Sequence, residues 1–125
     1  MSELFFFSAT HTIKEGKVEE FKKYVRELVE IVQANEPRVL AFNIYMNDDG
    51  TEVTNVQVHP DADSMVFHMQ VWREKIGGSY EFVETDSIEF CGTPNDQVLQ
   101  MARQLAGSGV SMNVKSHHLG GFTRF

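Results

Sequence analysis

The chain has 125 residues, 42% of them hydrophobic and 23% charged, so it is long enough to bury a core and has the composition of a globular protein. Its formal net charge of −7 argues against a nucleic-acid partner and against an anionic membrane surface. No segment approaches the roughly 20 consecutive apolar residues of a membrane helix. One cysteine and no secretory leader pattern predict a cytoplasmic protein, and the length predicts a single domain over residues 1–125.

The first half of the chain predicts a strand, a helix and a hairpin. Residues 4–13 are apolar, β-branched and aromatic, which favours a strand. After Gly16 the apolar residues recur at helical spacing as far as Asn35, and Pro37 stands just beyond as a stop. The turn sequence NDDGT then joins two alternating strands, residues 38–47 and 51–59.

The second half adds a helix, a strand and a C-terminal extension. Residues 61–76 predict a helix that ends at the glycine pair 77–78, and residues 87–92 predict a fourth strand. Residues 93–125 predict a further helix and a short strand. The order βαββαβ with an appended αβ unit indicates an α+β, ferredoxin-like fold over residues 4–92.

A ferredoxin-like sheet carries helices on one face, which makes the other face informative. The first predicted strand is apolar on both sides, with Phe5 and Phe7 on one and Leu4 and Phe6 on the other. Strands that are apolar on both sides indicate a sheet covered on both sides. We therefore predict a homodimer joined through its sheet faces, the alternative being a monomer with partly exposed aromatic residues.

Three stretches resemble the antibiotic biosynthesis monooxygenase domain: IKEGKVEEF, ANEPRVLAFNIYMNDDGTEV and a second helix that contains Phe-His. The shared landmarks are Gly16, Phe21, Glu36-Pro37 and His68, and the resemblance covers roughly residues 4–92. It implies a dimeric α+β barrel with a pocket between the helices and the sheet. The same barrel also serves proteins without oxygen chemistry, so the fold alone does not determine the function.

The sequence departs from two branches of that family. Quinol-oxidising members often carry a second histidine five residues after the first, followed by phenylalanine, where this chain has Arg73 and Glu74. Haem-degrading members use an asparagine on strand one and a tryptophan at the end of strand three. Here the matching regions offer Ala9, His11 and His59, which argues against haem breakdown of that kind.

A polar face on the third predicted strand marks a candidate binding site. Asn55, Gln57 and His59 share one face of that strand, and His11 occupies the face of strand one that we expect under the helices. Buried amides and imidazoles cost free energy unless they are paired, so a polar-lined pocket would explain them. The alternative is that this strand faces water or the dimer interface.

His68 is the candidate catalytic base, because imidazole titrates near neutral pH and can take a proton from a phenolic substrate. Asn43, Asn55 or Tyr45 could donate to a developing oxyanion, and Trp72 could wall the cavity or stack on a flat ligand. The alternative for His68 is a structural histidine bonded to a backbone carbonyl of the sheet.

No cofactor or metal site is expected. The five histidines show no zinc or iron spacing, and the adjacent pair His117 and His118 would point to opposite faces of a strand. The first hypothesis is a protein that binds an aromatic or quinone-like small molecule and oxidises it with dioxygen and no cofactor. The alternatives are a binding or structural protein without turnover and an isomerase-like enzyme that needs no oxygen.

Overall fold

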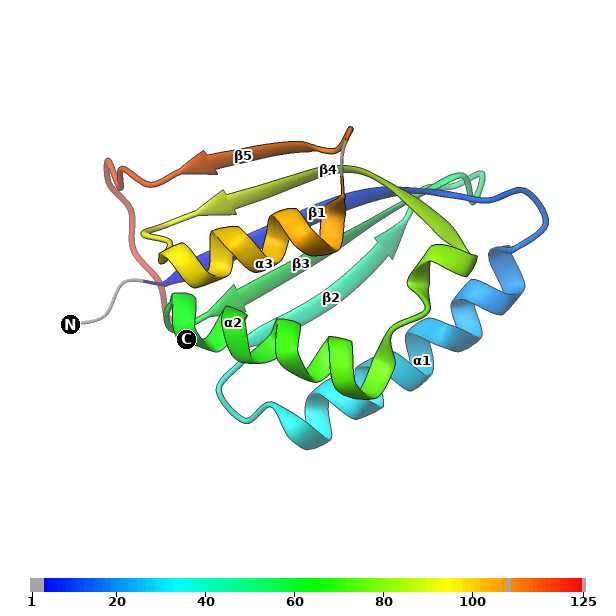
Figure 1. Cartoon of the computed structure of the whole chain (residues 1–125), viewed down its shortest axis with the longest axis horizontal. Coiled ribbons are helices and arrows are strands. Elements are labelled where there is room, and N and C mark those ends of the chain that lie inside the picture. The colour runs from blue at the N-terminus through cyan, green and yellow to red at the C-terminus, as the bar shows by residue number, and fades with distance from the viewer. Residues whose placement is uncertain (1–3, 108, 125) are drawn as a thin grey trace.

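The computed structural model describes residues 4–107 and 109–124, which form five strands and three α-helices (Figure 1). The first six elements follow the predicted order, and the extension supplies the last helix and strand. In chain order they are β1 (Phe5–Ile13), α1 (Val18–Asn35), β2 (Ala41–Met46), β3 (Glu52–His59), α2 (Ala62–Val71), β4 (Val83–Cys91), α3 (Asp96–Ala106) and β5 (Ser111–Lys115).

The sheet has the strand order β2-β3-β1-β4-β5. Antiparallel pairing joins β2 to β3, β3 to β1 and β1 to β4, which confirms the predicted ferredoxin-like plan. The C-terminal extension enlarges this plan, because β5 adds to the edge of the sheet by parallel pairing with β4. Among the described residues, no helix is both long and apolar enough to cross a membrane.

All three helices lie on one face of the sheet (Figure 1). Helix α1 turns an apolar stripe, which includes the buried Phe21, Leu28 and Val32, toward the strands. The strands alternate accordingly, and on β1 Phe5 and Phe7 are buried beneath the helices while the intervening Phe6 is exposed.

Three elements differ from their predicted bounds by three residues or more, and the first is β2, which begins at Ala41 rather than at residue 38. The helix predicted over 61–76 is α-helical only to Val71 and continues as a π-helical turn, Trp72–Ile76, in which the Gly77 N–H donates to the Trp72 carbonyl over 2.8 Å. Strand β4 begins at Val83 rather than at residue 87, and within it a bulge opposite Thr10 and His11 inserts one extra residue into the pairing with β1. Because of this extra residue, Val83 before the bulge and Ile88 and Phe90 after it all face the helix layer.

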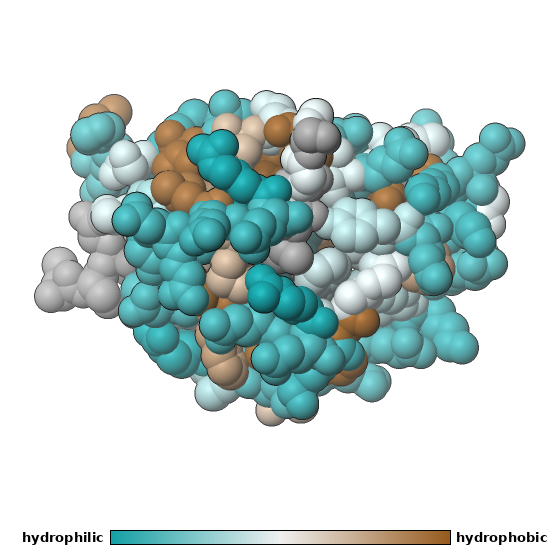
Figure 2. Space-filling view, viewed as in Figure 1, coloured by the Kyte–Doolittle hydropathy of each residue, from teal (hydrophilic) through white to brown (hydrophobic). Residues whose placement is uncertain are grey.

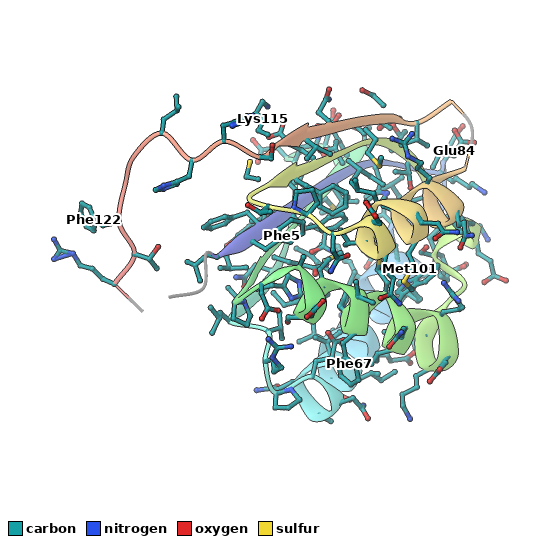
Figure 3. All side chains as sticks on the ribbon, turned by 60° about the vertical axis from the view of Figure 1, so that its left-hand side comes forward. Phe5, Phe67, Glu84, Met101, Lys115 and Phe122 are labelled. Carbon is teal, nitrogen blue, oxygen red and sulfur yellow. The ribbon has the colours of Figure 1, made fainter. Side chains whose placement is uncertain are left out.

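The largest apolar cluster lies between α2, α3 and strands β1 and β4. Phe90 is fully buried at its centre, with its ring 5.4 Å from that of Phe5 and 5.3 Å from that of Phe7, centroid to centroid. Figure 3 labels Phe5 on β1 and Met101 on α3, which contribute to this cluster from the sheet and from the helices. The same view shows Phe122 on the C-terminal tail, away from the core.

Candidate functional site

A cavity of about 130 Å³ lies between the helix side of the sheet and helices α1 and α2. An apolar cavity of about 150 Å³ admits benzene, so this one is the size of a single aromatic ring. Its floor includes Ala9 on the central strand β1, whose small side chain leaves room beneath the helices. Its walls are mostly apolar, and none of the described side chains that line it is a lysine, arginine, aspartate or glutamate.

A histidine–carboxylate pair forms one wall of this cavity. His68 on α2 lines the cavity, and its Nδ1 lies 2.9 Å from each carboxylate oxygen of Glu36. Both residues are buried, with 6% and 3% of their surfaces exposed. Because an ionised carboxylate only accepts hydrogen bonds, Nδ1 carries a hydrogen and the other ring nitrogen, Nε2, is left to exchange a proton.

The end of α1 explains how a glutamate comes to be buried here. Glu36 caps the helix, and its N–H donates to the Val32 carbonyl. Pro37 follows at once, which pushes the preceding residue out of the helical region, and Glu36 has φ −126° and ψ 78°. The chain thus leaves the helix at a residue whose side chain reaches His68 on α2.

The second nitrogen of His68 leads into a chain of buried hydrogen bonds. The Gln57 Nε2 amide donates to His68 Nε2 over 3.2 Å, and His59 Nε2 donates to the Gln57 Oε1 oxygen over 2.8 Å. The Ser64 hydroxyl completes the chain by donating to His59 Nδ1 over 2.7 Å. Burial lowers the pKa of His59 to about 3, with the neighbouring His68 contributing in the same direction, so this ring is neutral at physiological pH.

A second polar group borders the cavity farther along the sheet. His11 Nδ1 lies 2.9 Å from the Thr85 hydroxyl, and burial lowers the pKa of His11, partly offset by Asp86. Asn55 also lines the cavity, and its Oδ1 atom is enclosed with no hydrogen-bond partner among residues 4–107 and 109–124. An unpaired buried amide oxygen costs about 1–3 kcal/mol, so a hydroxyl or N–H donor held in the cavity would find an acceptor here.

Aromatic side chains form the remaining wall. Trp72 and Tyr80 both line the cavity, and their rings meet edge to face with centroids 6.2 Å apart. Tyr24 from α1 donates its hydroxyl hydrogen to the Gly77 carbonyl over 2.8 Å, which ties α1 to the segment after the π-helical turn. Single π-helical turns such as Trp72–Ile76 are frequent at functional sites. Figure 2 shows a mainly hydrophilic surface on this side of the molecule, interrupted by several smaller hydrophobic patches.

The predicted site residues fall into three groups. His11, Asn55, His68 and Trp72 all line the cavity, on the helix side of the sheet. His59 shares that side but is fully buried and bonded to Gln57 and Ser64, and it is not part of the cavity lining. The last two predicted residues, Asn43 and Tyr45, are exposed on β2, in the opposite phase to the buried side of that strand.

Asn43 and Tyr45 therefore do not reach the cavity, because successive side chains of a strand point to opposite faces. Their neighbours Phe42 and Ile44 are the β2 residues that line it. The alternative for His68 was a structural histidine bonded to a backbone carbonyl of the sheet. Its observed partners are instead the Glu36 carboxylate and the Gln57 amide.

Sequence reasoning missed the role of Glu36. It was placed in a turn with Pro37, and nothing local in the sequence indicates that a carboxylate 32 residues before His68 will be buried against it. Tyr24 and Thr85 were missed for different reasons: Tyr24 flanks the predicted apolar face of its helix, and Thr85 lies in a stretch that the sequence left without an element. Among the described residues, no cluster of three or more histidines, cysteines, aspartates or glutamates could hold a metal ion.

Comparison with known proteins identifies the fold. No protein-family model matches the chain, and no curated protein sequence matches it either. Among solved structures, MupZ from Pseudomonas fluorescens superposes with a TM-score of 0.75 at 19% identity, over 98% of this chain and 95% of that one. That coverage is wide enough to include α3 and β5.

Two further structures match mainly a smaller part of the chain. A candidate antibiotic biosynthesis monooxygenase from Bacteroides thetaiotaomicron matches with a TM-score of 0.59 at 19% identity, over 70% of this chain and 85% of that one. One from Nitrosomonas europaea gives 0.54 at 18% identity, over 66% and 82%. The chain therefore has the fold of antibiotic biosynthesis monooxygenase-like proteins, as the resemblance in its sequence predicted.

Proposed function

We propose that this protein binds a small neutral molecule with a ring-sized apolar body, and that His68 takes a proton from it and returns one. The observation that carries the proposal is the buried Glu36–His68 pair on the wall of the cavity. A carboxylate bonded to Nδ1 fixes the tautomer that leaves Nε2 basic, and it stabilises the positive charge that develops when Nε2 takes a proton.

The lining supports a neutral ligand. An anionic molecule would lose its hydration in a cavity that has no described cationic side chain, and the net charge of −7 repels anions at longer range. The polar groups that line the cavity include those of His68, Asn55 and the His11–Thr85 pair. A ring that carries one or two hydroxyl groups matches both the volume and this set of partners.

Oxygenation without a cofactor is the more specific form of this proposal. A phenol or quinol that loses a proton to His68 becomes an anion able to donate an electron to dioxygen. The fold neighbours described as candidate monooxygenases support this form. An isomerisation that starts with the same proton transfer uses the same residues, and oxygen consumption separates the two reactions.

Binding without turnover is the second candidate, and one observation favours it. The lone pair of His68 Nε2 already accepts a hydrogen bond from Gln57, so a ligand must compete for it. In this candidate the polar chain is structural, and replacing His68 leaves ligand binding and the fate of the ligand unchanged.

Trp72 makes the test direct, because it is the only tryptophan of the chain and lines the cavity. We expect phenol and toluene to change its fluorescence, and benzoate to bind at least about tenfold more weakly because its charge would be desolvated. Equal binding of benzoate, or no response to any of the three, would contradict the proposed ligand class.

Turnover is tested with an oxygen electrode and a panel of hydroquinones. The expected result is substrate-dependent oxygen uptake that His68→Asn abolishes while ligand binding, followed by Trp72 fluorescence, persists. His118→Asn, on the exposed tail, is the matched control and should change neither property. Binding without uptake, together with no exchange of carbon-bound ligand protons for deuterium, would favour the second candidate.

We also propose that two copies of the chain pair through the sheet face opposite the helices. Phe6, Tyr45 and Val56 lie on this face with 39%, 63% and 37% of their surfaces exposed. Burying such side chains against a second sheet is favourable at roughly 25 cal/mol per Å². Light scattering should give twice the mass of one chain, and Val56→Lys should shift the protein toward monomer, whereas a wild-type monomer at micromolar concentration contradicts the proposal.

A further inference from the structure

The side chain of Gln57 bridges two imidazole rings in the most enclosed part of the site. It lies 3.2 Å from His68 Nε2 through its nitrogen and 2.8 Å from His59 Nε2 through its oxygen. Gln57 and His59 are both fully buried, so solvent does not supply alternative partners to either. The hydrogen bonds of Gln57 and His59 must therefore be made with neighbouring side chains rather than with water.

An amide has one donating end and one accepting end, so the hydrogen bonds from Ser64 through His59 and Gln57 to His68 all run in one direction. When His68 is neutral, Gln57 donates to it and accepts from His59, and His59 accepts from the Ser64 hydroxyl. All polar atoms between Glu36 and Ser64 are then paired.

A proton added to His68 Nε2 reverses this direction. Two donors would otherwise face each other across 3.2 Å, so the Gln57 amide must turn to present its oxygen to His68. Its nitrogen then donates to His59 Nε2, which requires the other neutral tautomer of His59, with the hydrogen on Nδ1 donated to Ser64 Oγ. His59 changes tautomer by giving the Nε2 proton to water and taking one from water at Nδ1 during a transient opening of the site, so its proton count is unchanged. The reversed hydrogen-bond network is again fully paired once the site has closed.

We propose that Gln57 and His59 form a two-state hydrogen-bond relay that allows His68 to hold or release a proton without leaving a buried polar atom unpaired. His59 is then a positioning residue, since it touches neither the cavity nor the ligand but sets which end of Gln57 faces His68. This inference deepens the proposed proton transfer and names its control element, although the relay itself operates in the protein without ligand.

The surrounding charges are compatible with such a relay. The titratable and charged groups near the two rings are Glu36 at the end of α1, Asp61 at the start of α2 and Arg38 ahead of β2, besides each ring for the other. Arg38 and Asp61 pair with each other, at 2.5 Å. Burial keeps the pKa of His59 at about 3, so His59 stays neutral while His68 gains a proton and changes only its tautomer.

Nitrogen-15 NMR of the imidazole rings in the full chain tests the relay directly, because ring nitrogen shifts distinguish the two neutral tautomers from the protonated ring. At high pH we expect a hydrogen on His68 Nδ1 and on His59 Nε2. As the pH falls, His59 should move its hydrogen to Nδ1 with the same midpoint at which His68 becomes doubly protonated. A His59 tautomer that does not change, or a His68 that does not titrate before the chain unfolds, overturns the proposal.

Gln57→Glu sharpens the test because a carboxylate accepts at both ends. In this variant both rings can donate to residue 57 at once, so His59 should keep its hydrogen on Nε2 at every pH at which the chain stays folded. His11, which is bonded to Thr85 and is not part of the relay, is the internal control and should behave alike in both proteins. A tautomer switch that persists in Gln57→Glu overturns the relay.

The same data separate this inference from the proposed function. A coupled switch in a protein that shows no turnover leaves the relay standing and removes the catalytic proposal. Turnover that depends on His68, in a protein whose His59 tautomer does not change with pH, supports the catalytic proposal and removes the relay. The NMR measurement uses no ligand, so its outcome does not depend on knowing the substrate.

Discussion

The layer between the sheet and the helices has two halves that are built in opposite ways. The apolar half, between β1, β4, α2 and α3, is a cluster of phenylalanine, methionine and small aliphatic side chains centred on Phe90. The polar half, between β3, α2 and the end of α1, contains five buried polar residues, namely Glu36, Gln57, His59, Ser64 and His68.

The contrast shows which half stabilises the fold. Burial of apolar surface is the dominant favourable contribution to folding. A buried ionic or polar network roughly breaks even at best, and well-packed apolar replacements are often as stable or more so. We infer that the apolar half holds the protein together and that the polar half is retained for what it does beside the cavity.

The largest effect should come from the apolar half. Phe90→Ala removes a fully buried ring that packs against Phe5 and Phe7, and it leaves a cavity that the sheet cannot easily close. We expect a loss of about 4 kcal/mol in the free energy of unfolding, measured by urea denaturation. Phe67→Ala, on the exposed side of α2, is the matched control and should change the stability by no more than about 1 kcal/mol. Similar losses in the two variants would contradict this division of the core.

A smaller loss is expected when one partner of the polar half is removed. Glu36→Ala leaves the Nδ1 hydrogen of His68 buried and unpaired, which should cost about 3 kcal/mol in urea denaturation. The double variant Glu36→Leu with His68→Leu removes both polar partners, so it should recover most of that loss while removing the proposed proton acceptor. If the double variant is the least stable of all, the polar half stabilises the fold and our comparison is wrong.

The architecture was the more predictable part of this protein, for a physical reason. Strand alternation and helical spacing are local, so the order of elements and the helix side of β1 followed from the sequence. The alternation of β3 grouped Asn55, Gln57 and His59 on one face but left open whether that face meets the helices, and the structure places His11, Asn55 and His68 in one layer. The π-helical turn and the β4 bulge were not predicted, because both depend on packing between segments distant in the chain.

The site was predicted only in part because its partners come from different elements. Asn43 and Tyr45 were assigned to the cavity by residue type, but the phase of β2 turns them to the other face. Glu36 could not be paired with His68 from the sequence, since that contact depends on how α1 ends over α2. Local sequence patterns thus determine which residues share a face of a strand or helix. The side chain with which a residue pairs depends on the tertiary structure.

The polar half should also make stability depend on pH. The pKa of His59 is lowered to about 3 in the folded chain, whereas the unfolded chain has a value near 6.5, so the unfolded state binds the proton more readily. Its contribution is therefore complete above about pH 6.5 and is lost as the pH falls toward 3. Between pH 6.5 and 4.5 we expect the free energy of unfolding to fall by about 2 kcal/mol from this residue.

Urea denaturation of the wild type and of His59→Gln at several pH values isolates this contribution, because the carboxylates titrate in both proteins. The variant should show the shallower decline between pH 6.5 and 4.5. Identical slopes would mean that His59 is protonated in the folded state, which is incompatible with its place in the polar half as a neutral ring.

The smallest effect concerns the boundary between the polar half and the cavity, where Asn55 has an amide oxygen without a partner. If a ligand hydroxyl donates to that oxygen, Asn55→Ala should weaken binding of phenol, but not of anisole, by about 1 kcal/mol, or about fivefold. Anisole has no hydroxyl hydrogen to donate, so the ratio of the two affinities cancels any change in cavity size. Trp72 fluorescence supplies both affinities in each protein.

Asn43→Ala is the matched control, since it removes the same amide from the opposite face of the sheet. It should leave the phenol-to-anisole ratio unchanged. A ratio that falls equally in both variants would mean that the effect travels through the sheet rather than through contact with the ligand. A ratio that changes in neither would assign the hydroxyl to another partner, and the bonded pair His11 and Thr85, which lines the cavity, is among the described candidates outside the relay.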